Sequence, residues 1–217
     1  MQIFVEYFYL CVLIFFMKKI KTKDRLLLEA YKLFASKPYD QVTFADLEKA
    51  TKLSRGAILY HIQNKENLFR MVLDKYMFDP VSSQHILQHN PKIGLWDFIL
   101  LFLESLKKMK EEMRSIGIKN MNLAIFNIEC AAIYCFPDLK QAMKEWMNNE
   151  IEIRKQVLNN ALANKEIKEN TDIPLMATLL EHLSLGNCHH GTTLSKGEDL
   201  KILKKELRAL YDMIKAR

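Results

Sequence analysis

The sequence predicts an all-α protein, and three observations support that prediction. Apolar residues recur at three- and four-residue spacing almost throughout, whereas the strict alternation of a half-buried strand is hard to find. Glycine (6) and proline (5) are scarce among the 217 residues, so helices can run without interruption. Apolar residues make up 49% of the chain, which supplies enough side chains for a sizeable core.

The first predicted helix covers residues 22–36. Thr22 is a good N-cap, and Pro38 cannot continue the helix. Its apolar face has helical spacing and consists of Leu27, Ala30, Leu33 and Phe34.

Residues 43–68 contain two short helical patterns joined by a turn of three or four residues. Thr43 caps the first, whose apolar positions are Phe44, Leu47 and Ala50. The second, roughly residues 55–62, opens on the small, polar and basic run Ser-Arg-Gly-Ala. This is the build of a helix-turn-helix, in which the second helix enters the DNA major groove. A further helix follows Asn64 and ends near Pro80.

The polar stretch 81–92 reads as a linker or a loose short helix and is the best candidate for a domain boundary. Beyond it the apolar spacing predicts long helices, one of which has Pro174 in its first turn, where helix starts tolerate proline. The predicted ranges are 95–113, 120–135, 138–164, 172–188 and 196–214.

The formal net charge of +6 is unevenly distributed. Residues 17–80 hold 13 Lys and Arg against 8 Asp and Glu, so most of the excess lies on the helix-turn-helix third of the chain. Basic charge there would neutralise phosphates and release counterions. The alternative is an ordinary solvated face.

Residues 1–16 are almost wholly apolar but are shorter than a membrane span, and no basic leader precedes them as in a secretory signal. Met17-Lys-Lys-Ile resembles a natural protein start, so we expect residues 1–16 to be an extension from a misplaced start codon. The alternative is a short membrane-associating helix. Without that segment the sequence predicts no membrane partner, and the four scattered cysteines fit a cytoplasmic protein.

Motifs for other functions are missing from the sequence. Gly186–Gly191 has the glycine spacing of a phosphate loop, but Thr192 stands where its lysine must be. His182 and His189 lie seven residues apart rather than the four common in metal sites, and no carboxylate partner stands out. We therefore expect no enzyme activity, no metal and no cofactor.

Residues 22–79 resemble the DNA-binding domain of the tetracycline-repressor (TetR) family of bacterial transcription regulators. The resemblance rests on Leu28-Glu-Ala-Tyr-Lys-Leu-Phe34, Tyr39-Asp-Gln-Val-Thr43, Leu53-Ser-Arg-Gly-Ala-Ile58, His61 and Lys65-Glu-Asn-Leu-Phe69. It implies a helix-turn-helix DNA-binding domain over 17–80 and a helical domain over 81–217 for ligand binding and dimerisation. The final two helices would form a four-helix seam with the partner subunit, matching a palindromic operator.

The sequence departs from the family pattern in the turn and in the second helix of the motif. Lys52 occupies the usual glycine of the turn, and a left-handed lysine costs about 1 kcal/mol. The usual tyrosine falls at Leu59, with Tyr60 one place along, and the usual phenylalanine is Ile62.

Positions at the start of the second helix reach base edges, and flanking positions reach phosphates. We expect Arg55 and Ala57 to contact bases, Arg55 through guanine O6 and N7, and Gly56 to let the backbone approach DNA. The phosphate candidates are Thr43, Tyr60, His61 and Lys65. The predicted DNA-binding set is Thr43, Ser54, Arg55, Gly56, Ala57, Tyr60, His61 and Lys65. The alternative gives three of them structural roles, as a plain cap (Thr43), a half-buried ring (Tyr60) and a core-edge residue (His61).

The predicted effector pocket is apolar, because methionine and aromatic side chains repack around varied ligands. Its candidate residues are Trp96, Phe102, Met109, Met121, Phe126, Tyr134, Met143 and Trp146. The alternative for each is plain core packing. The sequence thus predicts a homodimeric, ligand-responsive repressor that binds double-stranded DNA and an apolar or amphipathic effector. The competing hypothesis is a helical scaffold or adaptor that does not bind specific DNA.

Overall fold

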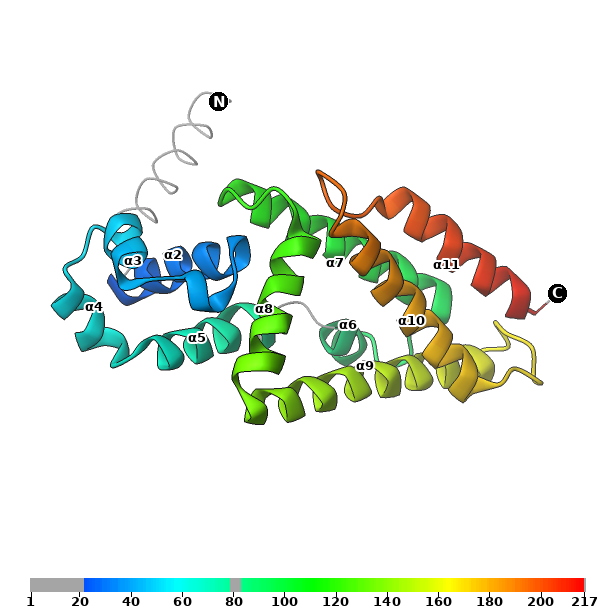
Figure 1. Cartoon of the computed structure of the whole chain (residues 1–217). Coiled ribbons are helices and arrows are strands. Elements are labelled where there is room, and N and C mark those ends of the chain that lie inside the picture. The colour runs from blue at the N-terminus through cyan, green and yellow to red at the C-terminus, as the bar shows by residue number, and fades with distance from the viewer. Residues whose placement is uncertain (1–21, 79–82, 217) are drawn as a thin grey trace, which may run out of the picture. The chain divides into compact units, whose positions relative to one another are not determined.

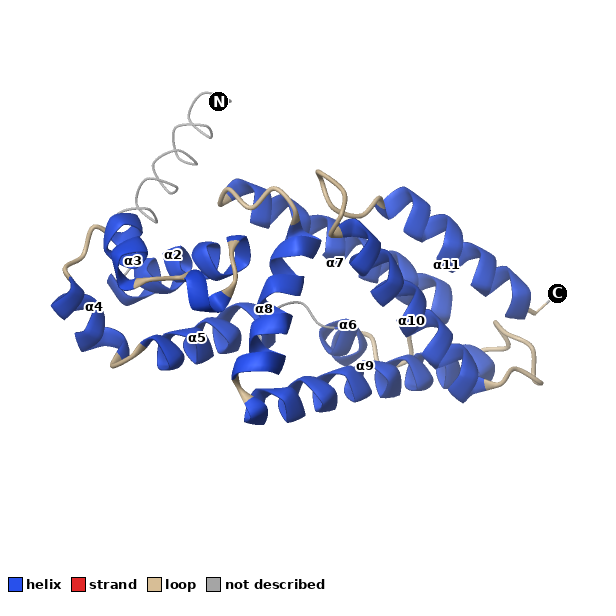
Figure 2. Ribbon diagram, in the orientation of Figure 1, coloured by secondary structure: helices blue, strands red, loops and turns tan. Residues whose placement is uncertain are grey.

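The computed structural model describes residues 22–78 and 83–216, and over these ranges the protein is helical (Figure 1). The loops that join the helices are short (Figure 2), and one antiparallel bridge links Ile167 to Lys215 within the described part. The predicted all-α fold is confirmed. The hypotheses about residues 1–16 lie outside the described residues. Nowhere in the described part does a helix combine the length and apolarity needed to cross a membrane.

Contacts divide the described chain into two units. The first holds residues 22–33 and 40–78, and the second holds residues 34–39 and 83–216. We call them the N-terminal unit and the C-terminal unit.

The N-terminal unit is built on the helix-turn-helix and the helices around it. Its elements are α2 (Thr22–Ser36, whose last residues count with the other unit), η1 (Tyr39–Gln41), α3 (Phe44–Thr51), α4 (Arg55–Ile62), α5 (Lys65–Leu73) and the π-helical η2 (Asp74–Phe78). The Tyr31 ring stacks on Tyr76 with centroids 4.6 Å apart, and Lys75 pairs with Asp24 at 2.6 Å. These contacts connect the start of the unit to its end.

The C-terminal unit consists of six helices within the described residues, and α9 packs against α6, α7, α8 and α10. The helices are α6 (Ser83–His89), α7 (Leu95–Ser115), α8 (Met121–Cys135), α9 (Pro137–Ala163), α10 (Ile173–Gly191) and α11 (Leu200–Ile214). Their main apolar core includes Leu95, Phe98, Ile99, Val157, Leu158, Ala177, Leu180, Leu203 and Leu207.

Of the two alternatives for residues 81–92, the short helix is the one the structure contains: α6 forms there because Ile86 and Leu87 are buried in the core. One predicted boundary differs for a local reason. The last helix begins four residues later than predicted. Gly197 adopts a φ of 73°, and the Asp199 side chain accepts a hydrogen bond from the Lys201 amide, which sets the start of α11.

The start of α7 depends on a residue far along the chain. The Glu166 carboxylate accepts hydrogen bonds from the amides of Leu95 and Trp96, both at 2.9 Å. These amides lack partners inside their own helix, so a carboxylate there satisfies them and favours the positive end of the helix dipole. A Cβ on Gly94 would meet the same carboxylate, so a larger residue at this N-cap would require the Glu166 side chain to shift.

Candidate nucleic-acid interface

The start of α3 is fixed by a capping box. The Thr43 hydroxyl accepts from the Asp46 amide at 3.2 Å, and the Asp46 carboxylate accepts from the Thr43 amide at 2.8 Å. The Thr43 hydroxyl also donates to this carboxylate at 2.7 Å. Thr43 therefore has the capping role that the alternative interpretation gave it, and a phosphate contact would need the hydroxyl proton to turn away from Asp46.

The turn between α3 and α4 has the left-handed residue that the motif requires. Lys52 adopts φ 58° and ψ 28°, and its amide donates to the Glu48 carbonyl at 2.9 Å. The buried Thr51 hydroxyl donates to the Leu47 carbonyl at 2.7 Å and accepts from the Leu53 amide at 3.3 Å. Lysine at position 52 thus preserves the turn, with the expected strain of a side chain in this region.

Helix α4 presents one side to the core and the other to solvent. Ile58 and Ile62 are completely buried, whereas Arg55, Gly56 and Tyr60 are exposed. The side chain of Ser54 caps the helix by accepting from the Ala57 amide at 3.3 Å. Because the Ser54 oxygen acts as an acceptor there, its own O–H remains a potential donor to a phosphate.

The predicted phosphate-contacting residues on and after α4 differ in their exposure and in their contacts within the protein. Tyr60 is 85% exposed, so the half-buried ring of the alternative interpretation is wrong. His61 is half-buried and meets the Tyr60 ring edge-on, with centroids 5.3 Å apart. Lys65 Nζ donates to the Val42 carbonyl at 3.1 Å, which links the start of α5 to the segment before α3.

Gly56 is a glycine that the fold itself does not require. A Cβ built at this position meets no atom within 4 Å, and the residue lies on the exposed side of α4. A glycine inside a helix costs about 1 kcal/mol relative to alanine. The physical reason for glycine here therefore lies outside the folded unit, and close approach of a nucleic-acid backbone is such a reason.

Sequence reasoning missed two residues of this face. The Arg55 guanidinium lies over the Phe44 ring, 4.8 Å from its centroid, although Phe44 was considered only as a position on an apolar face. Gln63 is exposed directly after α4, where a φ of 65° ends the helix. No sequence signal indicated the backbone of Gln63 or paired Phe44 with Arg55.

The predicted effector residues are scattered over the C-terminal unit. Tyr134 is 84% exposed and Phe126 is 39% exposed, whereas Met121 and Met143 are buried. Trp96 packs on Tyr211, with ring centroids 5.2 Å apart. A cavity of about 10 Å³ includes only Phe102 of the eight candidates; its lining is Leu95, Phe98, Ile99, Phe102, Arg154, Leu180, Ser184 and Leu207. Met109 and Trp146 are half-buried elsewhere, so the pocket assignment stays a prediction.

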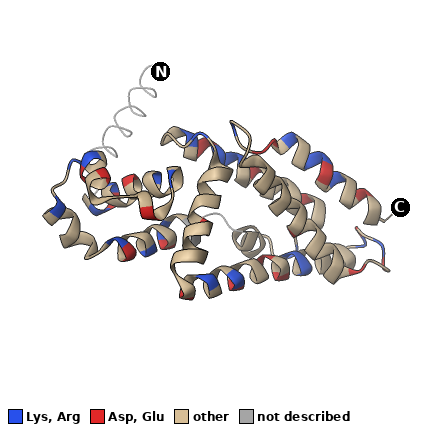
Figure 3. Cartoon of the chain, in the orientation of Figure 1, with Lys and Arg blue, Asp and Glu red and all other residues tan. Residues whose placement is uncertain are grey.

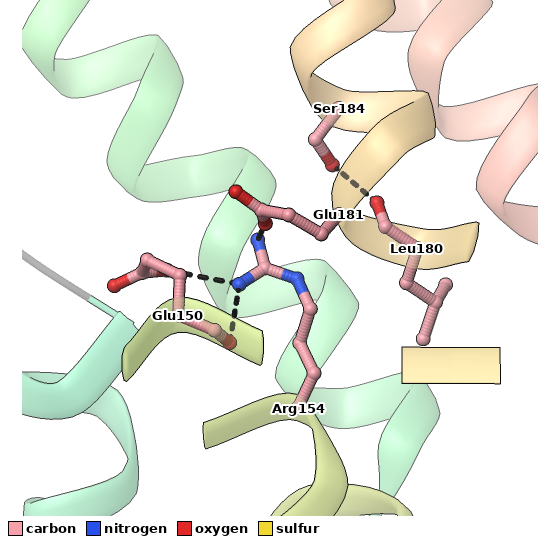
Figure 4. A network of polar contacts seen from close by, with 5 residues as sticks. All are labelled: Glu150, Arg154, Leu180, Glu181 and Ser184. Atoms are coloured by element: carbon pink, nitrogen blue, oxygen red, sulfur yellow. Dashed lines mark hydrogen bonds and ion pairs between the residues drawn. The ribbon is translucent and has the colours of Figure 1, made fainter. Parts of the chain in front are cut away.

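Beside this cavity lies a buried network of charges that sequence patterns did not reveal (Figure 4). The Arg154 guanidinium pairs with Glu150 on its own helix at 2.9 Å and with Glu181 on α10 at 2.7 Å. All three side chains are at least nine-tenths buried. Burial raises the pKa of Glu181, and the charge of Arg154 opposes that rise. Two carboxylates around one guanidinium fix the packing of α10 on α9.

Metal ligation has no support within the described ranges. No group of three or more His, Cys, Asp or Glu side chains there could hold a metal ion. The Cys188 sulfur instead accepts a hydrogen bond from the side-chain Nδ2 of Asn122 at 3.3 Å, and burial raises the pKa of the Cys188 thiol to about 11.

A capped helix-turn-helix with an exposed second helix, joined to a separate helical unit, defines a DNA-binding transcriptional regulator. Residues 26–72 match the family described as bacterial regulatory proteins, tetR family. This match, together with the relatives below, confirms the predicted resemblance of the N-terminal region to the TetR DNA-binding domain and the predicted class of transcriptional regulator.

Characterised relatives extend the similarity over most of the chain. It is 27% identical over 150 residues to the biofilm operon icaADBC HTH-type negative transcriptional regulator IcaR of Staphylococcus epidermidis, covering 67% of this chain and 68% of IcaR. It is 23% identical over 199 residues to a probable acrEF/envCD operon repressor of Escherichia coli, covering 90% and 86% respectively.

Solved structures show the same fold at lower sequence identity. A complex of SmeT with triclosan gives a TM-score of 0.65 at 14% identity and covers 90% of this chain and 92% of SmeT. A cysteine mutant of the TetR-family regulator CifR, bound to a 26-bp operator duplex, gives 0.61 at 15% identity and covers 88% and 95%.

Proposed function

We propose that the protein is a ligand-responsive repressor that binds a palindromic operator as a homodimer. The observation that carries the proposal is the exposed face of α4, where a glycine without an internal structural reason lies beside an exposed arginine and an exposed tyrosine. Relatives named as a negative transcriptional regulator and as an operon repressor support repression. The CifR–operator complex supports operator binding. With a DNA target, the protein is proposed to act in the cytoplasm.

The DNA contacts are assigned from the geometry of α4 and its flanks. Arg55 and Ala57 read base edges at the start of the helix, and Gly56 allows close approach of the phosphate backbone. The hydroxyl of Ser54 donates to a phosphate while its oxygen caps α4. The remaining phosphate contacts are made by Thr43, Tyr60, His61 and Lys65.

Homodimerisation is supported by apolar stripes on the two last helices, which pack against each other. Leu175 and Leu179 on α10 are 54% and 39% exposed, and Ile202 and Met213 on α11 are 51% and 66% exposed. Glu181 is the only Asp, Glu, Lys or Arg of α10, which is otherwise coloured as uncharged (Figure 3), and its side chain is buried against Arg154. The exposed leucines of the nearly uncharged α10, together with the exposed apolar residues of α11, suit a symmetric four-helix seam with a second copy.

The dimer is tested by the mass of the protein in solution at micromolar concentration. We expect twice the chain mass for the wild type and a single chain mass for Leu179→Asp, because a carboxylate cannot be buried unpaired in the seam. Leu123→Asp, at an equally exposed leucine on α8 (42% against 39%), is the matched control and is expected to stay dimeric. A monomeric wild type would refute the dimer.

The effector is proposed to bind the C-terminal unit, and the SmeT–triclosan complex supports an apolar or amphipathic ligand. Release from DNA requires that the ligand bind the conformation without DNA more tightly, by about 1–3 kcal/mol for typical coupling. TetR-family regulators act by binding rather than by catalysis, so no enzymatic step is proposed.

The function is tested by selecting bound duplexes from random DNA with the full chain. We expect an enriched palindrome, because a symmetric dimer presents two identical reading heads. Flat enrichment at low salt would contradict the proposal and favour the helical scaffold, for which the similar proteins give no support.

A further inference from the structure

The contact between Arg55 and Phe44 joins the first residues of the two helices of the motif. Phe44 begins α3 and is half-buried, and Arg55 begins α4 and is exposed. The guanidinium carbon lies 4.8 Å from the ring centroid, within the range of a cation–π contact.

Both ends of this contact stand on fixed backbone. The capping box of Thr43 and Asp46 fixes the residue before Phe44, and the Ser54 cap fixes the residue before Arg55. Leu47 of α3 and Ile58 of α4 are completely buried, which holds the two helices together. The ring is thus a stable platform rather than a mobile surface group.

The contact leaves the donors of Arg55 available. A cation–π contact is made by the charge of the guanidinium and uses none of its five N–H groups as hydrogen-bond donors. A side chain held over the ring has already lost part of the rotamer freedom that a free arginine would lose on binding. A guanine edge offers O6 and N7 as two acceptors for such a fork.

We propose that Phe44 is a positioning residue that orients Arg55 for bidentate contact with guanine and so sets the strength of the guanine preference. This inference rests on the proposed operator binding and extends it to a residue that touches no base. Phe44 acts through Arg55, so its effect is confined to the base that Arg55 reads.

The test uses the full chain and the duplex recovered from random DNA. Each guanine of a half-site is replaced in turn by 7-deazaguanine, which lacks the N7 acceptor, and the position sensitive to Arg55→Ala is identified. Phe44→Leu keeps an apolar side chain without a π face, and Phe44→Tyr keeps the ring. We expect Phe44→Leu to lower the preference for guanine over 7-deazaguanine two- to fivefold for each half-site, from the usual strength of an exposed cation–π contact.

Three further results are expected if Phe44 acts through Arg55. Phe44→Tyr retains the preference, Phe44→Leu has no added effect in the Arg55→Ala background, and affinity for unrelated duplexes does not change. Should Phe44→Leu unfold, Phe44→Met serves in its place, because methionine is a good helix former without a ring.

Two results would overturn the inference. An unchanged guanine preference in Phe44→Leu would show that the ring does not orient Arg55, and equal weakening on all duplexes would show a purely structural role. A wild type that enriches no sequence would instead contradict the proposed function, so the two failures are distinguishable.

Discussion

The two units differ most in what they bury. Within the described residues the N-terminal unit buries apolar side chains and one polar side chain, Thr51, whereas the C-terminal unit buries four charged ones. These are Glu150, Arg154, Glu181 and Glu198. Buried charges need partners brought from other helices, so the C-terminal unit depends on long-range pairing where the N-terminal unit depends on local signals.

The helix caps show the same difference. Thr43, Ser54 and Asn64 each cap a helix of the N-terminal unit by accepting from an amide three residues along. The C-terminal unit contains local caps too, but the amides that open α7 are satisfied by Glu166, about seventy residues away. A short window of sequence therefore specifies the helix-turn-helix of the N-terminal unit, whereas the C-terminal unit also depends on residues far apart in the sequence.

Breaking the buried network is expected to have the largest effect. Arg154→Ala leaves Glu150 and Glu181 buried beside each other without a cation, which we expect to lower the free energy of unfolding by about 3–5 kcal/mol. The control is Lys155→Ala, one residue along α9. Its pair with the exposed Glu152 is worth less than about 1 kcal/mol. Urea denaturation measures both; equal losses would mean that the buried charges contribute no special stability.

A second prediction concerns Glu129 on α8, because burial raises its pKa from 4.5 to about 7. The folded state therefore binds a proton that the unfolded state has released. The resulting stability is complete below pH 4.5 and is lost as the pH rises through about 7.

The wild type is expected to lose about 2–3 kcal/mol of unfolding free energy between pH 5 and pH 8 through Glu129, and Glu129→Gln is expected to abolish this loss. Denaturation at the two pH values measures it. Glu145→Gln, on the exposed side of α9, is the charge-matched control. A variant with the same pH dependence as the wild type would show that Glu129 does not titrate in this range.

At Gly56 in the N-terminal unit, stability and DNA binding are expected to respond in opposite directions to the same substitution. Gly56→Ala adds a methyl group in open space, so we expect it to raise the free energy of unfolding by about 0.5–1 kcal/mol. On DNA the same methyl group meets the backbone, and overpacking of about 1–3 kcal/mol implies operator binding weaker by about 5- to 150-fold. Denaturation measures the expected gain in stability, and a binding titration measures the expected loss of operator affinity. Unchanged binding would remove close approach as the reason for glycine.

The smallest effect is expected in the turn. Lys52 has a left-handed backbone, so Lys52→Gly is expected to stabilise the N-terminal unit by up to about 1 kcal/mol. Lys49→Gly, in the right-handed part of α3, is expected to destabilise by a similar amount. Thermal unfolding of the two variants gives opposite shifts on this account, and shifts of the same sign would contradict it.

What the sequence could predict follows from this contrast. The approximate ranges predicted for α2 and α4 agree with the structure over the described residues, because Pro38, the Ser54 cap and apolar spacing are local signals, although Thr22, predicted as an N-cap, lies within α2. The pairing of Arg154 with Glu181, twenty-seven positions apart, has no such signal, and neither has the stacking of Arg55 on Phe44. The effector residues were chosen by type alone, and type does not tell that Tyr134 faces solvent while Met143 is buried.

The central claim is that α4 reads bases while its flanks hold phosphates. It is tested most directly by titrating wild type, Arg55→Ala and Lys65→Ala against the selected duplex and a scrambled one at several salt concentrations. We expect Arg55→Ala to lose about 1–3 kcal/mol per half-site on the selected duplex only. Lys65→Ala is expected to weaken both duplexes alike and to reduce the salt slope by about one for each head. Equal losses for Arg55→Ala on both duplexes would contradict base reading by α4.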